Sequence, residues 1–184
     1  MSKCKVCKID YKKSNSTQVV CSVLCAAKLQ IIKRIAKDKK ETKIKLDALK
    51  TKPQLTKELQ KVFNAYIRQR DYGNNCISCD KTIDWESSTS TGGVCDAGHY
   101  LSVGSRVHLR FNEDNVHAQC KYCNNYLAGN PASYRVGLIK KIGLDRVKAL
   151  ECNSTVNKHS TEHLKGMIDY YKLNIKNIKN DKQS

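Results

Sequence analysis

The chain has 184 residues, with 34 Lys and Arg against 17 Asp and Glu, and its formal net charge is +17. This length allows one modest domain and an appendage, which excludes large multidomain proteins. Charge spread along the whole chain indicates a polyanionic partner, and nucleic acid is favoured over a membrane because the longest apolar run, residues 19–27, is too short to span a bilayer. Cysteines occupy the place of a secretory signal's apolar segment, so we expect a soluble cytoplasmic protein without membrane contact.

Residues 1–27 contain two close cysteine pairs and little that could form an apolar core. Cysteines separated by two or three residues can direct both thiolates at one tetrahedral Zn²⁺ ion, a regularity that disulfides do not require. We therefore expect a zinc module that folds only with metal, whose second pair lies at the start of the next helix and whose ligands are Cys4, Cys7, Cys21 and Cys25. Its lysines leave two roles open, a contact with DNA and a structural cap.

Residues 28–53 predict a basic linker helix. Helical propensity extends from Ala26 to Lys52, lysines dominate, and Pro53 should end the helix. A charge run of this kind is commonly a solvated surface, but the excess of positive charge also suits an arm that contacts phosphates. Both interpretations stay open.

Residues 54–178 are expected to form the main domain. The domain begins with a helix whose apolar residues recur on one face from Leu55 to Ile67 and which Gly73 stops. The next stretch, "CISC", contains Cys76 and Cys79, and "WESSTSTGGV" after it predicts a loop.

The middle of this domain predicts two strands and a helix. "CDAGHYL" and "RVHLRFN" have the character of strands joined by the hairpin "SVGSR", and "NEDNVHAQCKYCNNYL" turns out of the hairpin into a helix. Short helices interrupted at Gly143 follow, and then a final helix capped by Ser160 or Thr161. Residues 179–184 are assigned to a disordered tail.

A second zinc site is expected in this domain, with ligands Cys76, Cys79, Cys120 and Cys123. Four thiolates leave no open position, so this zinc would be structural, and it would hold the hairpin against the helix that follows. The two remaining cysteines, Cys95 and Cys152, are expected to be buried thiols.

Phosphodiester hydrolysis needs a base to activate water and a hard cation to neutralise charge on the phosphate. A neutral imidazole at His99 meets the first need. An amide oxygen of Asn124, directly after the second cysteine pair, meets the second, and Asp96 is the nearest carboxylate that could share a Mg²⁺ ion with it.

The order C-x2-C, strand with His, Asn, C-x2-C-Asn resembles the HNH, or ββα-metal, endonucleases, particularly phage Holliday-junction resolvases of the endonuclease VII type. Over nearly its full length the chain is similar to the NinG, or Rap, family of lambdoid phages, through the N-terminal cysteine module and the stretches "FNAYIRQRD", "CISC", "DAGHY", "HLRFNEDNVHAQCKYCN" and "YRVGLIKKIG". This resemblance implies a recombination nuclease that cuts branched DNA, such as Holliday junctions and D-loops, in the bacterial host cytoplasm.

The resemblance also implies roles for single residues. His99 matches the general base, Asn115 the asparagine that holds the loop and orients the base, and Asn124 the ligand of a catalytic Mg²⁺ or Mn²⁺ ion. Enzymes of the endonuclease VII type have Asp directly before the base, where this chain has Gly98. Since positions 96 and 99 of a regular strand face opposite sides, Asp96 could share a site with His99 only through a bulge, which Gly98 permits.

The expected fold is α+β, a small zinc-stabilised HNH-like core surrounded by helices and preceded by a zinc module and a basic linker helix. The expected function is a metal-dependent, structure-selective DNA endonuclease with two structural Zn²⁺ ions and one catalytic divalent cation. Arg106 and Arg110 are candidate phosphate contacts, with solvated surface as the alternative. His108 and His117 are expected to be simply hydrogen-bonded, with a contact to phosphate or to groups around the site as the alternative.

Two other functions fit the same composition. One is a non-catalytic zinc-containing protein that binds nucleic acid, and the other is a zinc protein directed at RNA. A homodimer and contacts with recombination proteins also stay open, because nothing in the sequence marks a dimer interface.

Overall fold

The computed structural model describes residues 1–86, 95–155 and 159–182, in two compact units, Met1–Lys50 and Thr51–Ser184. Both units mix helices with a two-stranded antiparallel sheet, so the α+β class is confirmed. Most of the predicted loop at residues 85–94 lies outside the described residues. Among the described residues, no helix combines the length and the apolar character needed to cross a membrane.

The first unit consists of a small sheet and one long helix. Strands β1 (Ser2–Lys3) and β2 (Asp10–Tyr11) pair, and helix α1 (Val23–Ala48) follows. The Ser22 side chain caps α1 by accepting a hydrogen bond from the Cys25 backbone N–H at 3.2 Å. The second cysteine pair therefore lies at the start of this helix, as predicted.

The boundary between the predicted linker and the next helix differs from expectation. α1 ends at Ala48, and Pro53 lies in the first turn of helix α2 (Lys52–Arg70) instead of ending α1. Proline is tolerated in a first helical turn because the N–H that it lacks would have no partner there. The Gln54 side chain accepts a hydrogen bond from the Thr51 backbone N–H at 2.8 Å and completes this helix start.

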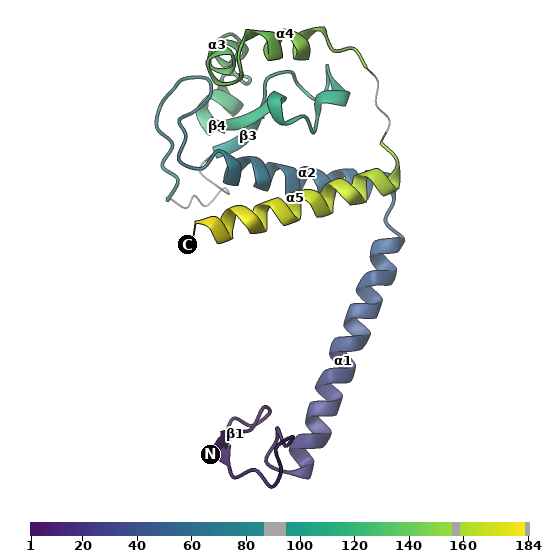
Figure 1. Cartoon of the computed structure of the whole chain (residues 1–184). Helices are drawn as coiled ribbons and strands as arrows, with labels where there is room; N and C mark the ends of the chain where they lie inside the picture. Colours follow the sequence, from purple (N-terminus) through teal and green to yellow (C-terminus); the bar gives the residue numbers. More distant parts are fainter. Residues whose placement is uncertain (87–94, 156–158, 183–184) are drawn as a thin grey trace. The chain divides into compact units, whose positions relative to one another are not determined.

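The main core of the second unit lies between α2 and helix α5 (Thr161–Asp181), which run side by side (Figure 1). α2 buries residues four apart, Leu55, Leu59, Phe63 and Ile67, as its apolar periodicity predicts. α5 begins after Ser160, whose side chain accepts from the His163 backbone N–H, and it continues to Asp181, into the segment assigned to a tail.

A two-stranded ribbon lies between α2 on one side and α3 and α4 on the other (Figure 1). Strand β3 (Cys95–His99) pairs with β4 (Val116–Cys120) in an unbroken register from Cys95↔Cys120 to His99↔Val116. The first predicted strand is confirmed. The second is wrong, because "RVHLRFN" contains the short 3-10 turn η1 (Val107–Leu109), and the partner strand comes later in the chain.

The misplaced strand has a packing explanation. Val107, Leu109 and Phe111 alternate along the sequence as in a strand, but Val107 is exposed, while Leu109 and Phe111 belong to two separate core clusters. A second 3-10 turn, η2 (Glu113–Asn115), leads into β4. The expected helix after β4 is a single wide π-helical turn, η3 (Tyr122–Tyr126).

Helices α3 (Pro131–Ile142) and α4 (Leu144–Cys152) complete the domain and are separated at Gly143, as predicted. Gly143 has φ +86°, a left-handed conformation that glycine adopts without strain. The Tyr134 hydroxyl donates to the Gly98 carbonyl oxygen at 2.8 Å and ties α3 to β3.

Candidate functional site

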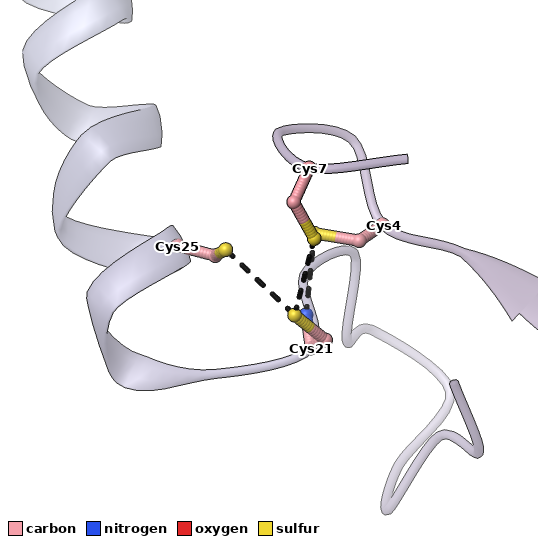
Figure 2. A group of neighbouring side chains, drawn as sticks. All are labelled: Cys4, Cys7, Cys21 and Cys25. Carbon is pink, nitrogen blue, oxygen red and sulfur yellow. Dashed lines mark hydrogen bonds between the residues drawn. The ribbon is translucent and has the colours of Figure 1, made fainter. Parts of the chain in front are cut away.

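The first cysteine group lies at the junction of the small sheet and α1 (Figure 2). Its four sulfur atoms lie within 4.8 Å of one another, with Cys7 Sγ 3.5 Å and Cys25 Sγ 3.7 Å from Cys21 Sγ. The Cys21 backbone N–H also donates to Cys4 Sγ at 3.4 Å. The predicted ligands are therefore brought together.

The second cysteine group joins three elements of the main domain. Cys76 and Cys79 lie in the loop after α2, Cys120 ends β4, and Cys123 lies in η3. All four sulfur atoms lie within 4.8 Å of one another, and Cys79 Sγ is 3.9 Å from Cys120 Sγ. Backbone N–H groups of Cys120 and Cys123 donate to Cys76 Sγ and Cys120 Sγ, an arrangement that favours thiolates.

Both groups fit the chemistry of a structural zinc ion. A Zn–S bond of about 2.3 Å in a tetrahedron places the sulfur atoms about 3.8 Å apart. The separations of 3.5, 3.7 and 3.9 Å fall close to this value. Each group could therefore hold one Zn²⁺ ion, with four thiol ligands and no open position.

The two cysteines outside these groups have different environments. Cys95 is buried, as predicted, and this burial raises the pKa of its thiol to about 11. Cys152 is exposed at the end of α4, so its predicted burial is wrong. The apolar spacing of α4 places Val147 and Leu150 inward and leaves residue 152 outside the buried face.

An open hollow lies beside β3 and brings together the residues predicted to bind a catalytic cation. Asp96 and Ala97 line it from β3, Asn64 and Arg68 from α2, and Lys121, Asn124, Asn125 and Tyr126 from around η3. Asn124 Nδ2 donates to Asp96 Oδ2 at 3.0 Å. The structure therefore places Asp96 and Asn124 in direct contact, although 28 residues separate them in sequence.

The amide of Asn124 can present oxygen as well as nitrogen to this hollow. Side-chain amide oxygen and nitrogen are assigned from the hydrogen-bond network, and a half-turn of the amide exchanges them. Asn125 Nδ2 also donates to Asp96 Oδ2, at 3.3 Å. The side-chain amides of Asn124 and Asn125 thus both donate to the same carboxylate oxygen of Asp96.

His99 lies at the end of β3, partly buried, and its Nε2 is 3.0 Å from the Arg110 carbonyl oxygen. Because a carbonyl oxygen only accepts, Nε2 carries the proton and Nδ1 keeps a free lone pair. Burial lowers the pKa of His99, and the nearby Arg110 charge acts in the same direction. The imidazole is therefore neutral at pH 7.

No bulge interrupts β3, since five consecutive residues pair with β4 in regular register. Asp96 and His99 thus project from opposite faces of the ribbon, and the bulge considered at Gly98 is not formed. The reason for glycine at this position is a close neighbour. A Cβ on Gly98 would lie 2.1 Å from Gln119 Oε1 and 2.9 Å from Gln119 Cβ.

Gln119 is fully buried and fills the face of the ribbon above Gly98. Its Nε2 donates to Ser78 Oγ and to the Gly129 carbonyl oxygen, both at 2.6 Å. An aspartate at position 98, directly before His99, would therefore have no room for its side chain. The nearest carboxylate on the same face of β3 as Gly98 is that of Asp96, two residues before Gly98.

Asn115 is buried and holds the loop between β3 and η1. Its Oδ1 accepts from the Leu101 backbone N–H at 2.8 Å, and its Nδ2 donates to the carbonyl oxygens of Leu101 and Leu109. Leu109, which is held in this way, directly precedes Arg110, whose carbonyl oxygen contacts His99. This geometry fits a residue that positions His99 without contacting it.

The two arginines predicted to contact phosphates have protein partners. Arg106 donates to the carbonyl oxygens of Glu151 and Asn153 at the end of α4, each at 3.4 Å. Arg110 Nε donates to Gln60 Oε1 at 2.6 Å, but Arg110 also lines a groove along α2 with Lys57, Lys61 and Asn64. Arg110 is the better placed of the two for an anion.

His108 and His117 are hydrogen-bonded, as predicted. His108 Nε2 donates to the Asn153 carbonyl oxygen at 2.9 Å. His117 is buried beside Asp71, and its Nδ1 accepts from Arg70 at 2.8 Å. Burial alone would raise the pKa of Asp71, but the hydrogen bonds from Arg70 and the charges of Arg70 and Lys141 hold it far below its usual range.

Sequence reasoning missed several residues of the hollow. Arg68 and Asn64 lie four apart on α2, which was considered core without chemistry. Their four-residue spacing, directly beside the buried stripe of α2, is the signal that could have identified them. Asn125 was left out of the metal site, although it contacts the same Asp96 oxygen as Asn124 does.

Comparisons with known proteins cover nearly the whole chain. Residues 1–181 match the family model described as Bacteriophage Lambda NinG protein. Protein ninG of Escherichia phage lambda is 37% identical over 140 residues, 76% of this chain, and the match spans less than two thirds of that protein, 65%. Protein ninG of Escherichia phage 933W is 31% identical over 198 residues, which cover 98% of this chain and 94% of that protein.

Protein ninG of Salmonella phage P22 is 36% identical over 140 residues, 76% of this chain and 65% of that protein. No solved structure matches the chain. The residues matched by the family model include both cysteine groups and all residues that line the hollow, so the predicted resemblance to NinG is confirmed. The chain belongs to the bacteriophage lambda NinG family.

Proposed function

We propose that this protein is a metal-dependent DNA endonuclease that cleaves branched DNA. The observation that carries the proposal is the contact between Asp96 and Asn124 in an open hollow that Arg68 and Lys121 also line. With metal bound, the second cysteine group would fix this contact, because Cys123 immediately precedes Asn124. A carboxylate and an amide side chain in contact beside positive charge suit a bound cation and a phosphodiester substrate.

The donor set fits Mg²⁺ or Mn²⁺ better than zinc. Mg²⁺ keeps several of its waters and needs only one or two protein ligands, so one carboxylate and one amide oxygen suffice. When bound, such a cation would neutralise charge on the scissile phosphate. Asp96 and Asn124 would hold it after a half-turn of the Asn124 amide.

His99 is the proposed general base. Its neutral imidazole, with Nε2–H held by the Arg110 carbonyl oxygen, leaves Nδ1 able to accept a proton from water. Although His99 and Asp96 project from opposite faces, the hollow includes both Asp96 and Ala97, which lie on opposite faces of β3. A DNA backbone that follows the edge of β3 could therefore reach the side chains of both His99 and Asp96.

A basic track supports a DNA partner. The groove along α2 is lined by Lys52, Lys57, Lys61 and Arg110, and Asn64 lines both this groove and the hollow. Lysines spaced along a helix neutralise successive phosphates without reading sequence. Contacts of this kind do not depend on base sequence, so they suit a partner that is recognised through its backbone.

The experiment uses zinc-loaded protein and a synthetic four-way junction with Mg²⁺ or Mn²⁺. We expect the wild-type protein to cleave it, and His99→Ala and Asp96→Asn to reduce cleavage at least about 100-fold while junction binding persists. His163→Ala is the matched control, because His163 is an exposed histidine of α5. Absence of cleavage by the wild-type protein on every branched substrate would sink the proposal.

A non-catalytic nucleic-acid-binding protein is the second candidate, and one observation favours it. The regular register of β3 keeps His99 away from the Asp96 and Asn124 pair in this arrangement. This candidate predicts junction binding that none of these substitutions changes, and no cleavage with either cation. The same set of assays therefore separates the two.

A further inference from the structure

Two tyrosines project from the turn that contains Asn124. Tyr122 and Tyr126 are 63% and 79% exposed. Their rings stack on each other, with centroids 6.0 Å apart and planes inclined by 27°. Tyr126 also lines the hollow with Asp96 and Asn124.

The local backbone explains how these rings come together. η3 is a π-helical turn closed by a hydrogen bond from the Leu127 N–H to the Tyr122 carbonyl oxygen at 3.2 Å. A wide turn of this kind brings residues four apart onto one side, and π turns occur frequently at functional sites. Cys120 and Cys123 hold the turn in place, so the rings are presented on a rigid element.

Packing does not account for this pair. Other tyrosines of the domain use their hydroxyl groups inside the fold, such as Tyr134 with the Gly98 carbonyl oxygen and Tyr66 with Glu113. Neither Tyr122 nor Tyr126 has a hydrogen-bond partner for its hydroxyl among the described residues. The exposed, stacked rings of Tyr122 and Tyr126 form an apolar surface of the kind that binds a partner.

We propose that Tyr122 and Tyr126 form a stacking platform for unpaired bases of branched DNA, beside the site where the backbone is cut. This inference rests on the proposed function for its substrate. Exposed aromatic rings bind the flat faces of bases without sequence preference, and each stacked base contributes about 5- to 150-fold in affinity. Lys121 and Arg68, which line the same hollow, provide charge for the adjacent phosphates.

The platform gives a physical basis for structure selectivity. In an intact duplex both faces of each base are covered by its neighbours, so an aromatic ring finds no free face. At a branch point or a single-stranded flap some bases are unstacked and available. The tyrosine pair would therefore strengthen binding to branched DNA and leave binding to plain duplex to the basic track along α2.

Binding is measured with zinc-loaded protein and no added Mg²⁺ or Mn²⁺, so that the result does not depend on cleavage. The probes are a fluorescent junction with a short unpaired flap and a duplex of equal length. We expect the double variant Tyr122→Ala/Tyr126→Ala to lose about tenfold or more in affinity for the flapped junction and less than about twofold for the duplex. Tyr126→Trp should retain the preference.

Tyr170→Ala is the matched control, since Tyr170 is 57% exposed on α5, outside the hollow. Zinc content and the midpoint of thermal unfolding establish that each variant folds. An equal loss for both probes, or no loss for either, would overturn the platform. If the wild-type protein does not cleave but the double variant loses its preference, the proposed nuclease fails and the platform stands; if it cleaves and the preference is unchanged, the platform alone fails.

Discussion

The two four-cysteine groups offer the same four thiols to a metal but lie in different surroundings. In residues 1–50 the buried residues are Cys4 and Cys25, which are themselves candidate ligands. Around the second group, Ile83, Cys95 and Ala118 are buried against the cysteines, and two further apolar clusters lie elsewhere in the domain. In residues 1–50 a bound metal would take the place of an apolar core. In the main domain it would link elements that are already packed around apolar clusters.

Removal of zinc should have the largest effect and should separate the two regions. With a strong chelator, we expect residues 1–22 to lose fixed structure, because zinc binding supplies about 10–16 kcal/mol in small modules without another core. Helices α2 and α5 should persist. Limited proteolysis with mass spectrometry checks this, and earlier cleavage within α2 or α5 than within the first 22 residues would contradict the comparison.

Substitution of Gly98 tests how far the close packing of the β3–β4 ribbon against Gln119 stabilises the main domain. Gly98→Ala should destabilise the main domain by about 3 kcal/mol, since its Cβ would overlap the buried Gln119 side chain. Gly166→Ala in α5 is the control, because nothing lies within 4 Å of a Cβ there. It should stabilise by about 0.5–1 kcal/mol. Urea unfolding measures both changes, and equal effects would show that the Gly98 contact is unimportant.

Acid should weaken the second region through buried side chains. Burial lowers the folded-state pKa of His99 and of His117, so the unfolded chain binds protons first and stability falls as the pH drops below about 6.5. The pKa of Asp71 is also lowered in the folded state, so its contribution is present above about pH 4 and is lost below it. Urea midpoints at pH 7.5, 5.5 and 3.5 give the profile.

A matched variant isolates one histidine in this profile. His117→Gln removes one titrating group, so the slope of stability between pH 6.5 and 5 should become shallower even though the variant is less stable at pH 7.5. His163→Gln, at an exposed position, is the control. If the slope of stability against pH is the same in His117→Gln as in the wild-type protein, His117 does not contribute to the loss of stability in acid.

The smallest effect is expected at the cysteines outside the two groups. Cys152→Ser should change stability by less than about 0.5 kcal/mol because the side chain is exposed, whereas buried Cys95 should be costlier to replace. In zinc-loaded protein, a thiol reagent should label Cys152 rapidly and Cys95 slowly. Peptide mass spectrometry identifies the labelled residue, and rapid modification of Cys95 would contradict its burial.

Much of the local structure could be predicted from short-range patterns. The apolar residues of α2, the break at Gly143 and the Ser160 cap each depend on neighbours within one or two turns, and all three are confirmed. The strand predicted over residues 106–112 is wrong, because Leu109 and Phe111 are buried in two separate clusters and not on one strand face. An alternating apolar pattern in the sequence does not show whether the apolar side chains pack into one cluster or into two.

The cysteine groups, most of the helices and the family could be predicted from the sequence, because ligand spacing and helical periodicity are properties of nearby residues. Three contacts could not be predicted in this way: Gln119 fills the space above Gly98, α4 holds Arg106, and Asn125 joins Asn124 at Asp96. Each of these contacts joins residues from different elements. Their distances depend on how the ribbon packs between α2 and α3, which no local pattern encodes.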